Sequence, residues 1–297
     1  MSLGATTKWD PPVRPEYELP LALAAALAPT QDAPASPALE RLGNQGWLRK
    51  GILLAVVALL WELAARWADN DLLLPGFVQT ARALVDGVAS GELPRYVGVS
   101  LWVLLQGYLA GVLGAFLLTS LAMSTRIGRD LLETLTAMFN PLPAIALLPL
   151  ALLWFGLGTG SLVFVLMHSV MWPLALNMYA GFRSVPDTLR MAGRNYGLGG
   201  ARMVTHILVP AALPAILSGL KIGWAFAWRT LIAAELVFGT TSGKGGLGWY
   251  IFQNRNELFT DKVFAGLAMV ILIGLLFENL VFQSVERITV RRWGMQR

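Results

Sequence analysis

The amino-acid sequence predicts an all-α, polytopic membrane protein with six transmembrane helices. Of its 297 residues, 56% are hydrophobic and only 14% are charged, whereas about a quarter of the residues in a soluble domain are charged. The hydrophobic residues are concentrated in six stretches that approach or exceed the roughly 20 residues needed to cross a bilayer. The chain has no cysteine, which excludes disulfides and any metal site built on thiolates.

Residues 1–45 are interpreted as a cytoplasmic tail rich in Pro and Ala, preceding a membrane domain at 46–297. The apolar run LPLALAAALA at 19–28 resembles the core of a signal peptide, but acidic residues precede it in place of a basic region. Its ten residues are also too few to cross a hydrocarbon core of about 30 Å.

The predicted spans and their flanking charges give an orientation. The spans are 50–68, 96–122, 133–156, 161–182, 211–238 and 263–285. Thirteen Lys and Arg residues flank them on one side: Arg41, Arg49, Lys50, Arg126, Arg129, Arg183, Arg190, Arg194, Arg202, Arg287, Arg291, Arg292 and Arg297. Six lie on the other side: Arg66, Arg82, Arg95, Lys244, Arg255 and Lys262. Because basic residues are enriched in cytoplasmic loops, both termini and the 183–210 loop are expected in the cytoplasm.

Between the first two spans, GFVQTARALVDGVAS at 76–90 predicts an amphipathic helix on the outer membrane surface. Its apolar residues share one helical face. They are Val78, Ala81, Leu84, Val85 and Val88.

Glycines recur at four-residue spacing in two predicted spans. Gly107 and Gly111 lie in the second span, and Gly219 and Gly223 lie in the fifth. Small residues at this spacing let helix backbones approach closely. We expect packing within the chain, with a contact between two copies as the alternative.

The third span, NPLPAIALLPLALLWFG, is interrupted by Pro141, Pro143 and Pro149. Each proline removes a backbone donor and disturbs the preceding turn. Carbonyls freed in this way need protein or water as partners. The span is therefore a candidate for lining a pathway, and a kink that serves only packing is the alternative.

The loop after the fourth span predicts two short helices that meet at glycine. Asp187 provides a helix start because Asp caps helix N-termini. Leu189, Ala192, Gly193 and Tyr196 then share one face. Gly197 is expected at C′, where a helix commonly ends. A second helix is expected over 201–208, stopped before Pro210.

The segment MAGRNYGLGGARMVTHILVPAALPAIL at 191–217 resembles the EAA loop of permease subunits of bacterial binding-protein-dependent ABC importers. The family pattern is Glu-Ala-Ala, three residues, Gly, then a spacer ending in Leu-Pro. Met191-Ala192-Gly193 replaces Glu-Ala-Ala and matches only at Ala192, whereas Gly197 and Pro210 keep the spacing. The motif Glu is missing, and Asp187, one turn earlier, is the candidate substitute. Over about residues 50–293, the chain is similar to the nitrate, taurine and alkanesulfonate branch.

This resemblance implies a type I ABC importer permease fold in the bacterial inner membrane. Two permeases, here expected to be a homodimer, form the pore within the lipid bilayer. Separate ATPase subunits bind ATP and Mg and grip the hairpins, and a periplasmic binding protein delivers the substrate. ATP-driven movement of the hairpins switches the pore between outward and inward access. The implied coupling residues are Asp187, Met191, Ala192, Gly193, Tyr196, Gly197, Leu198, Gly199, Gly200, Ala201 and Pro210.

Ionisable residues within a membrane commonly face a pathway or the bundle interior. Arg229 lies near the middle of the fifth span and offers a fork of donors to an anion. A structural tie to a buried acid or to carbonyls of the third span is the alternative. Glu235 resembles the acid of the family's Ala-Ala-Glu segment and is expected at the outer end, as a gate or packing residue. The expected path residues are Asn140, Pro141, Pro143, Trp228, Arg229 and Glu235.

Other classes of protein fit the sequence less well. GTTSGKG at 239–245 has three residues between its glycines, and Gly follows its Lys, so it is not a Walker A loop. No metal or nucleophile motif occurs, and His168 is expected to be a hydrogen-bonded packing residue. The expectation is therefore a permease without its own cofactor, without catalytic residues and without a nucleic-acid partner, for a small and anionic nutrient. An ion-coupled secondary transporter, an integral membrane enzyme, or an importer of another small organic solute are the alternatives.

Overall fold

The computed structural model describes residues 46–238 and 245–291, and every regular element in this part of the chain is a helix. Five helical segments are long and apolar enough to cross a membrane, and a bent pair of helices makes a sixth candidate. The predicted all-α membrane fold is confirmed. The predicted tail at 1–45 and all but the last residue of the 239–245 loop lie outside the described residues.

The first element is α3 (Gly46–Ala68), a helix with a nearly continuous apolar surface. Its C-terminal end is fixed by Trp61, whose Nε1 donates to the Pro75 carbonyl at 3.0 Å. The Trp61 ring also contacts Phe77 and Phe264 edge-on or tilted, with centroids 5.6 and 5.7 Å away. This end of α3 therefore packs on the elements that follow it.

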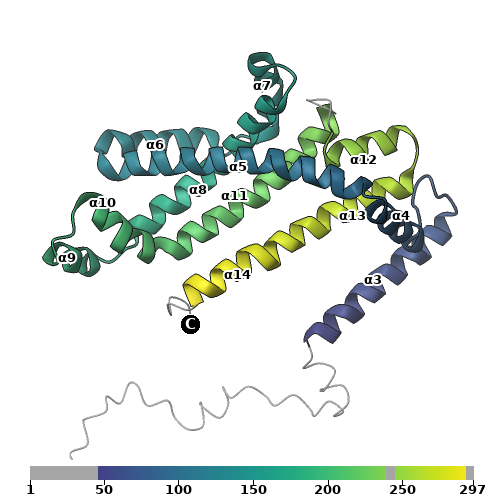
Figure 1. Ribbon diagram of the computed structural model, residues 1–297, viewed down its shortest axis with the longest axis horizontal. Coiled ribbons are helices and arrows are strands. Elements are labelled where there is room, and N and C mark those ends of the chain that lie inside the picture. Colours follow the sequence, from purple (N-terminus) through teal and green to yellow (C-terminus); the bar gives the residue numbers. More distant parts are fainter. Residues whose placement is uncertain (1–45, 239–244, 292–297) are drawn as a thin grey trace, which may run out of the picture. The chain divides into compact units, whose positions relative to one another are not determined.

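The core is formed by α5 (Glu92–Ser124), α8 (Thr159–Arg183) and α11 (Val209–Phe238), which lie side by side (Figure 1). Glycines set the close approach of α5 to α8: Gly107 faces Leu166, and a Cβ on Gly111 would lie 2.6 Å from that of Val170. On α11, Gly223 faces Val170 from the other side. The glycine spacing therefore serves packing within the chain, as expected.

The third predicted span is not one helix. It consists of α6 (Arg126–Phe139), the short 3₁₀ helix η2 (Ala144–Leu147) and α7 (Leu148–Phe155), with a bend of 91° between the two halves. Pro141 and Pro143 lie in the bend, where the missing backbone donors and the pyrrolidine rings prevent helix continuation. Pro149 lies in the first turn of α7, where no donor is needed. Figure 1 shows α6 beside α5 and α7 turned away from it.

The helix after the 183–200 loop does not stop before Pro210, contrary to the prediction. α10 (Gly200–Met203) passes through a π-helical turn, η3 (Val204–Leu208), directly into α11. Val209 N–H bonds to the Val204 carbonyl five residues back, which widens the helix ahead of Pro210. The wider turn relieves the clash between a proline ring and the preceding turn.

The remaining elements cover one end of the core. α4 (Phe77–Ala89) packs on α13 (Thr260–Leu276), and α12 (Leu247–Asn256) packs on α11 and α13. Val78, Val85 and Val88 on α4 are exposed, consistent with the expected amphipathic helix on a membrane surface. α13 continues through the π-helical η4 (Phe277–Phe282) into α14 (Gln283–Glu286) and η5 (Arg287–Arg291).

Candidate functional site

The bend between α6 and α7 opens onto a cavity of about 370 Å³ against α8 and α11. Four of the predicted path residues line this cavity. Asn140, Pro141 and Pro143 belong to the bend, and Arg229 belongs to α11. The other lining residues are Phe139, Leu142, Ala144, Ile145, His168, Ser169, Trp172, Pro173, Phe226, Thr230 and Ala233. Residues about 90 positions apart in the sequence therefore meet at one site.

The bend itself is an ordered turn. Leu142 N–H bonds to the Phe139 carbonyl at 3.2 Å, and Ala146 N–H bonds to the Pro143 carbonyl at 2.9 Å. Pro143 is extended, with φ −60° and ψ 119°, and begins η2. The backbone thus leaves helical geometry at the cavity wall, as irregular backbone in a membrane does where it lines a cavity.

Arg229 is the one residue with a permanent charge among the described residues that line this cavity. Its Nε donates to the Ala225 carbonyl at 3.0 Å, one turn back in α11, and its guanidinium lies 5.0 Å from the Phe226 ring centroid. Within the described part of the chain, no carboxylate lies within ion-pair distance of Arg229. The remaining guanidinium donors are available to a ligand.

His168 and Trp172 also line this cavity, one turn apart on α8. Both are buried, and neither ring nitrogen of His168 nor Nε1 of Trp172 has a hydrogen-bond partner among the described residues. Their rings contact Phe139, with Trp172 stacked at 5.3 Å and His168 edge-on at 6.0 Å. The expectation that His168 is hydrogen-bonded is therefore wrong, because the aromatic packing supplies no acceptor or donor. Trp172 was not among the residues predicted from the sequence to line the path, although its four-residue spacing from His168 was a usable signal.

Trp228 and Glu235, also expected along the path, lie outside this cavity. Trp228 is buried against α13, where its Nε1 donates to the Val270 carbonyl at 3.3 Å. The Glu235 carboxylate accepts from Ser100 Oγ at 2.9 Å and from Gly248 N–H at 2.8 Å. Ser100 Oγ in turn accepts from Leu247 N–H at 2.8 Å. Glu235 therefore joins α11 to α5 and to the start of α12.

The predicted coupling hairpin consists of α9 (Asp187–Asn195) followed by α10. Gly197 has φ +73°, and two bonds close the end of α9: Gly197 N–H to Arg194 O at 2.9 Å and Leu198 N–H to Gly193 O at 2.9 Å. This is a Schellman motif with Gly197 at C′, as predicted. Asp187 is the first helical residue and Pro186 occupies the N-cap, so the predicted side-chain cap is not formed.

The hairpin presents a largely exposed outer surface. Tyr196 is 86% exposed and Met191 60%, and Ala192 is also exposed. Gly193 is buried, and a Cβ there would lie 3.0 Å from the Met203 sulfur. The remaining expected coupling residues follow the bend: Leu198 is half-buried, Gly199 and Gly200 are exposed, Ala201 lies in α10, and Pro210 lies in the first turn of α11. A small residue at 193 therefore lets the two arms close, while the aromatic and apolar side chains point outward.

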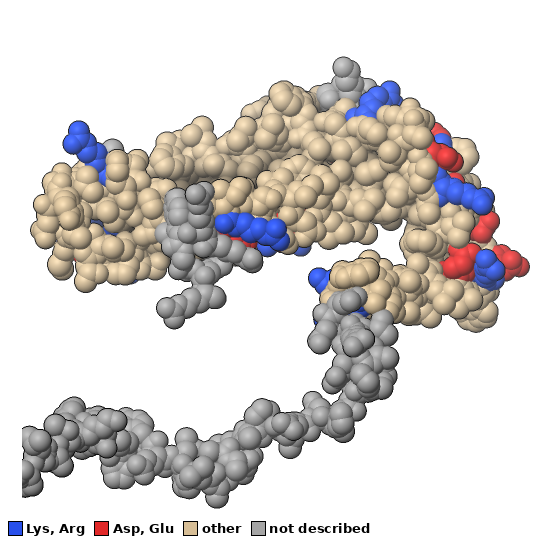
Figure 2. Space-filling view, turned by 60° about the horizontal axis from the view of Figure 1, so that its bottom comes forward, with Lys and Arg blue, Asp and Glu red and all other residues tan. Residues whose placement is uncertain are grey.

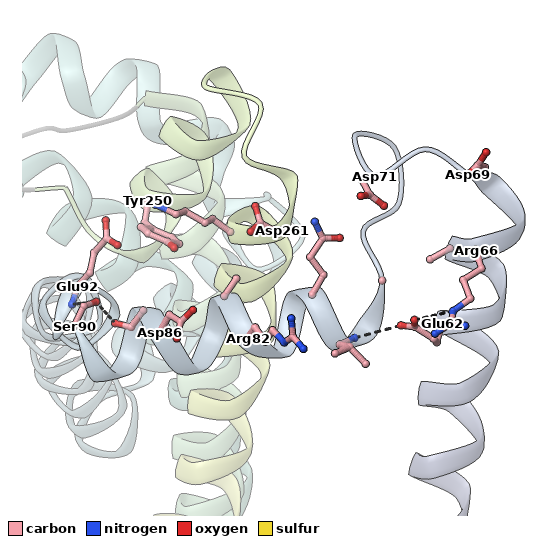
Figure 3. A pocket seen from close by; sticks show the side chains of 17 residues that line it. Glu62, Arg66, Asp69, Asp71, Arg82, Asp86, Ser90, Glu92, Tyr250 and Asp261 are labelled. Atoms are coloured by element: carbon pink, nitrogen blue, oxygen red, sulfur yellow. Dashed lines mark hydrogen bonds and ion pairs between the residues drawn. The ribbon is translucent and has the colours of Figure 1, made fainter.

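A larger hollow of about 870 Å³ lies at the opposite end of the core (Figure 3). Asp86, Glu92, Tyr250 and Asp261 line it from α4, α5, α12 and α13. Burial, together with the carboxylates of Glu92 and Asp261, raises the pKa of Tyr250. Figure 2 shows most of the acidic side chains in this view gathered at one end together with basic ones, while other basic side chains lie near the opposite end and near the middle of a largely uncharged surface. This distribution is typical of a membrane protein whose charged groups lie outside the bilayer.

Comparison with known proteins decides the family. Residues 107–290 match the model of the family described as binding-protein-dependent transport system inner membrane component. The chain belongs to this family. The match covers the cavity, the hairpin, α8, α11 and the part of α5 from Gly107 onward.

Several relatives of this permease share most of its length. The taurine transport system permease protein TauC of Escherichia coli (strain K12) is 30% identical over 80% of this chain and 86% of its own. The nitrate import permease protein NrtB of Synechocystis sp. (strain ATCC 27184 / PCC 6803 / Kazusa) is 26% identical over 79% of this chain and 86% of its own length. The putative aliphatic sulfonates transport permease protein SsuC of Escherichia coli (strain K12) is 32% identical over 79% of this chain and 88% of its own length.

These matches identify an ABC importer permease of the nitrate, taurine and sulfonate branch. It is a multi-pass protein of the inner membrane, and its family works with ATPase subunits and a periplasmic binding protein. The family is one of transport permeases and not of enzymes.

Proposed function

We propose that this permease is the pore subunit of an ATP-driven importer that passes a small nutrient with an anionic group, such as a sulfonate, taurine or nitrate, into the cytoplasm by alternating access. The observation that carries this proposal is the cavity at the α6–α7 bend, where Arg229 is the one permanent charge among the described lining residues. A cationic group at membrane depth favours an anion and rejects cations. Nitrate, carboxylate and sulfonate groups all match the donor fork of a guanidinium.

The structure of the cavity supports transit better than permanent binding. Its lining combines the one charge of Arg229 with the polar residues Asn140, Ser169 and Thr230 on a mostly apolar surface, and the ring nitrogens of His168 and Trp172 are buried beside it. Such a site lowers the free-energy barrier to the passage of a desolvated anion. It does not supply the full set of ligands that would bind the anion tightly. Weak binding is what a pathway requires, because the substrate must leave again.

The hairpin supports coupling to an ATPase. Its exposed Tyr196 and Met191 are residue types that form the centres of protein interfaces. We expect them to insert into a cleft of an ATPase subunit, which would bind ATP and Mg, with both chain termini on the same cytoplasmic side. Closure of the ATPases would then move α9 and, through the continuous helix after it, α11 with Arg229.

The α7 segment supports a pore made of two copies. Leu153, Trp154, Phe155 and Leu157 are between 54% and 79% exposed at the end of this short helix. We expect this apolar surface to pack against the second permease of a homodimer. The cavity wall at the bend would then be completed between the two copies.

The decisive experiment is uptake by the complete complex carrying Arg229→Met, with Arg229→Lys as the matched variant that keeps the charge. The ligand of the cognate binding protein, chosen from taurine, alkanesulfonates and nitrate, is the transported probe. Loss of a charge-assisted hydrogen bond predicts uptake lowered by about tenfold or more in the Met variant. The Lys variant should retain more of the activity.

Co-purification of each variant with the ATPase is the control. We expect both variants to pass it, because Arg229 lies far from the hairpin in the sequence. Uptake that is unchanged in Arg229→Met, in an intact complex, would show that Arg229 does not contact the substrate. A binding protein whose ligand is a cation would contradict the anion proposal as a whole.

A further inference from the structure

A third cavity, of about 340 Å³, lies where the spans α5 and α8 end beside the coupling hairpin. It is lined by residues of α5, α6, α8 and α9: Met123, Arg129, Tyr179, Arg183, Asp187 and Arg190. It shares no lining residue with the cavity at the α6–α7 bend. Of its lining residues, Asp187 alone is one of the expected coupling residues.

The cavity has an excess of positive charge. Three guanidinium groups face one carboxylate, that of Asp187, which is 87% exposed and lies 4.0 Å from Arg190. Among the described residues, Arg129 and Arg183 have no carboxylate within ion-pair distance. The two unpaired guanidinium groups therefore have free donors for an anion.

Two buried polar groups in the cavity also lack partners. Tyr179 is 7% exposed, and its hydroxyl makes no hydrogen bond within the described part of the chain. Nε of Arg190 is likewise buried without a hydrogen-bond partner. Buried polar atoms are normally satisfied, so their orphaned state points to a ligand.

The arrangement is held in place by the fold. Arg190 Nη2 donates to the Phe182 carbonyl at 2.7 Å, which fixes this guanidinium against the end of α8. The Arg183 guanidinium lies 5.7 Å from the Tyr179 ring centroid. Several guanidinium groups and a phenol around one space form a site for a phosphate group, because planar guanidinium donors bind phosphate oxygens in pairs.

We propose that this cavity binds the phosphate of an anionic lipid headgroup. Its position at the ends of two membrane spans places it at headgroup depth, where basic pockets between transmembrane helices bind anionic lipids. Asp187 and Arg190 belong to the first turn of α9. A bound headgroup therefore holds the start of the coupling hairpin against the membrane surface.

The test measures lipid retention by the complete permease–ATPase complex. The complex is purified, delipidated, reconstituted in nanodiscs of phosphatidylglycerol mixed with phosphatidylcholine, and analysed by native mass spectrometry for bound phosphatidylglycerol. The test variant is Arg129→Gln combined with Arg183→Gln. Arg190 is left intact because it also bonds to the Phe182 carbonyl.

The matched control is Arg126→Gln, which removes an exposed charge from the same turn of α6 as Arg129 without touching the cavity. The expected result is phosphatidylglycerol affinity lowered about 30-fold by the double variant. The control should stay within about twofold of the original protein. Equal retention by the double variant and the original protein would overturn the proposal.

Two further arms separate the possible sources of the anion. Inorganic phosphate added to the complex in phosphatidylcholine alone should bind far more weakly than the lipid, and stronger binding would assign the cavity to a soluble anion instead. If the double variant loses its ATPase but keeps its lipid, the arginines contact the ATPase and the lipid proposal is wrong. Neither result bears on Arg229 and the substrate, which the uptake experiment tests separately.

Discussion

At the residue scale, Ser100 and Glu235 show how a buried acid is made tolerable in an apolar core. Ser100 Oγ donates to the carboxylate and accepts from Leu247 N–H, so one hydroxyl connects three helices. Gly248 supplies the second donor to Glu235. An ionisable residue in this setting is costly unless each polar atom has a partner.

Replacing Ser100 with Ala should therefore destabilise the protein. The change removes one donor from Glu235 and leaves Leu247 N–H buried without a partner, which costs about 1–3 kcal/mol. The thermal unfolding midpoint of the purified complex in detergent should fall. Ser124→Ala is the control, because Ser124 is exposed and bonds only to its own helix. A midpoint equal to that of the control would show that the Ser100 link carries no stability.

At the element scale, the contact between α5 and α8 depends on glycine. A Cβ at Gly111 would lie 2.6 Å from Val170 Cβ and 2.9 Å from the Met167 carbonyl oxygen, and a backbone atom cannot move aside cheaply. Gly98, on the same helix, has nothing within 4 Å.

Gly111→Ala should consequently lower stability by about 1–3 kcal/mol, the usual cost of overpacking. Gly98→Ala should be neutral or slightly stabilising, because Ala is the better helix former. Thermal unfolding of both variants, in the same detergent, compares them directly. Equal midpoints would mean that α5 and α8 do not approach as closely as the structure shows.

The end of α9 depends on a glycine for a different reason, which is backbone conformation. Gly197 has φ +73°, and no atom lies within 4 Å of the place where a Cβ would be. A side chain at this position would therefore strain the backbone conformation but would not clash with a neighbour. Gly199 also has open space, without a left-handed φ.

Gly197→Ala should cost about 1–2 kcal/mol in the hairpin. The strain would loosen the Schellman turn, so substrate-stimulated ATP hydrolysis by the reconstituted complex should fall. Gly199→Ala should leave this stimulation close to normal. An equal loss in both variants would instead indicate that the ATPase excludes any side chain at the bend.

At the scale of the whole molecule, the topology is open to a direct chemical test because the chain contains no cysteine. Single cysteines at three exposed sites report on the sides of the membrane: Asp71→Cys before α4, Leu157→Cys after α7, and Arg194→Cys in the hairpin. A membrane-impermeant maleimide should label the first two in intact spheroplasts. The third should react only after lysis.

Labelling at 157 is the informative case. If the α6–α7 pair crosses the membrane as one broken span, Leu157→Cys lies on the outer side and reacts from outside. Reaction at 157 only after lysis would show that the pair re-enters the membrane and returns to its starting side. Labelling of Arg194→Cys from outside would reverse the proposed orientation.

The sequence by itself determined the class of fold, the approximate spans and the end of α9. Hydropathy depends on composition over about 20 residues, and a glycine at C′ depends on local backbone sterics. Both are local properties, so no knowledge of neighbouring helices is required. The turn between α9 and α10 was likewise predicted from Gly197, whereas the predicted end of the second helix before Pro210 was wrong.

Only the tertiary structure decided which residues meet. It brought Asn140, Pro141 and Pro143 to Arg229, placed Trp228 and Glu235 outside that cavity, and left His168 without a hydrogen-bond partner among the described residues. These outcomes depend on how α6, α8 and α11 pack, which is set by contacts between residues far apart in the sequence. Helical spacing gives the angle of a side chain around its own axis, but the neighbour that it faces is fixed by packing.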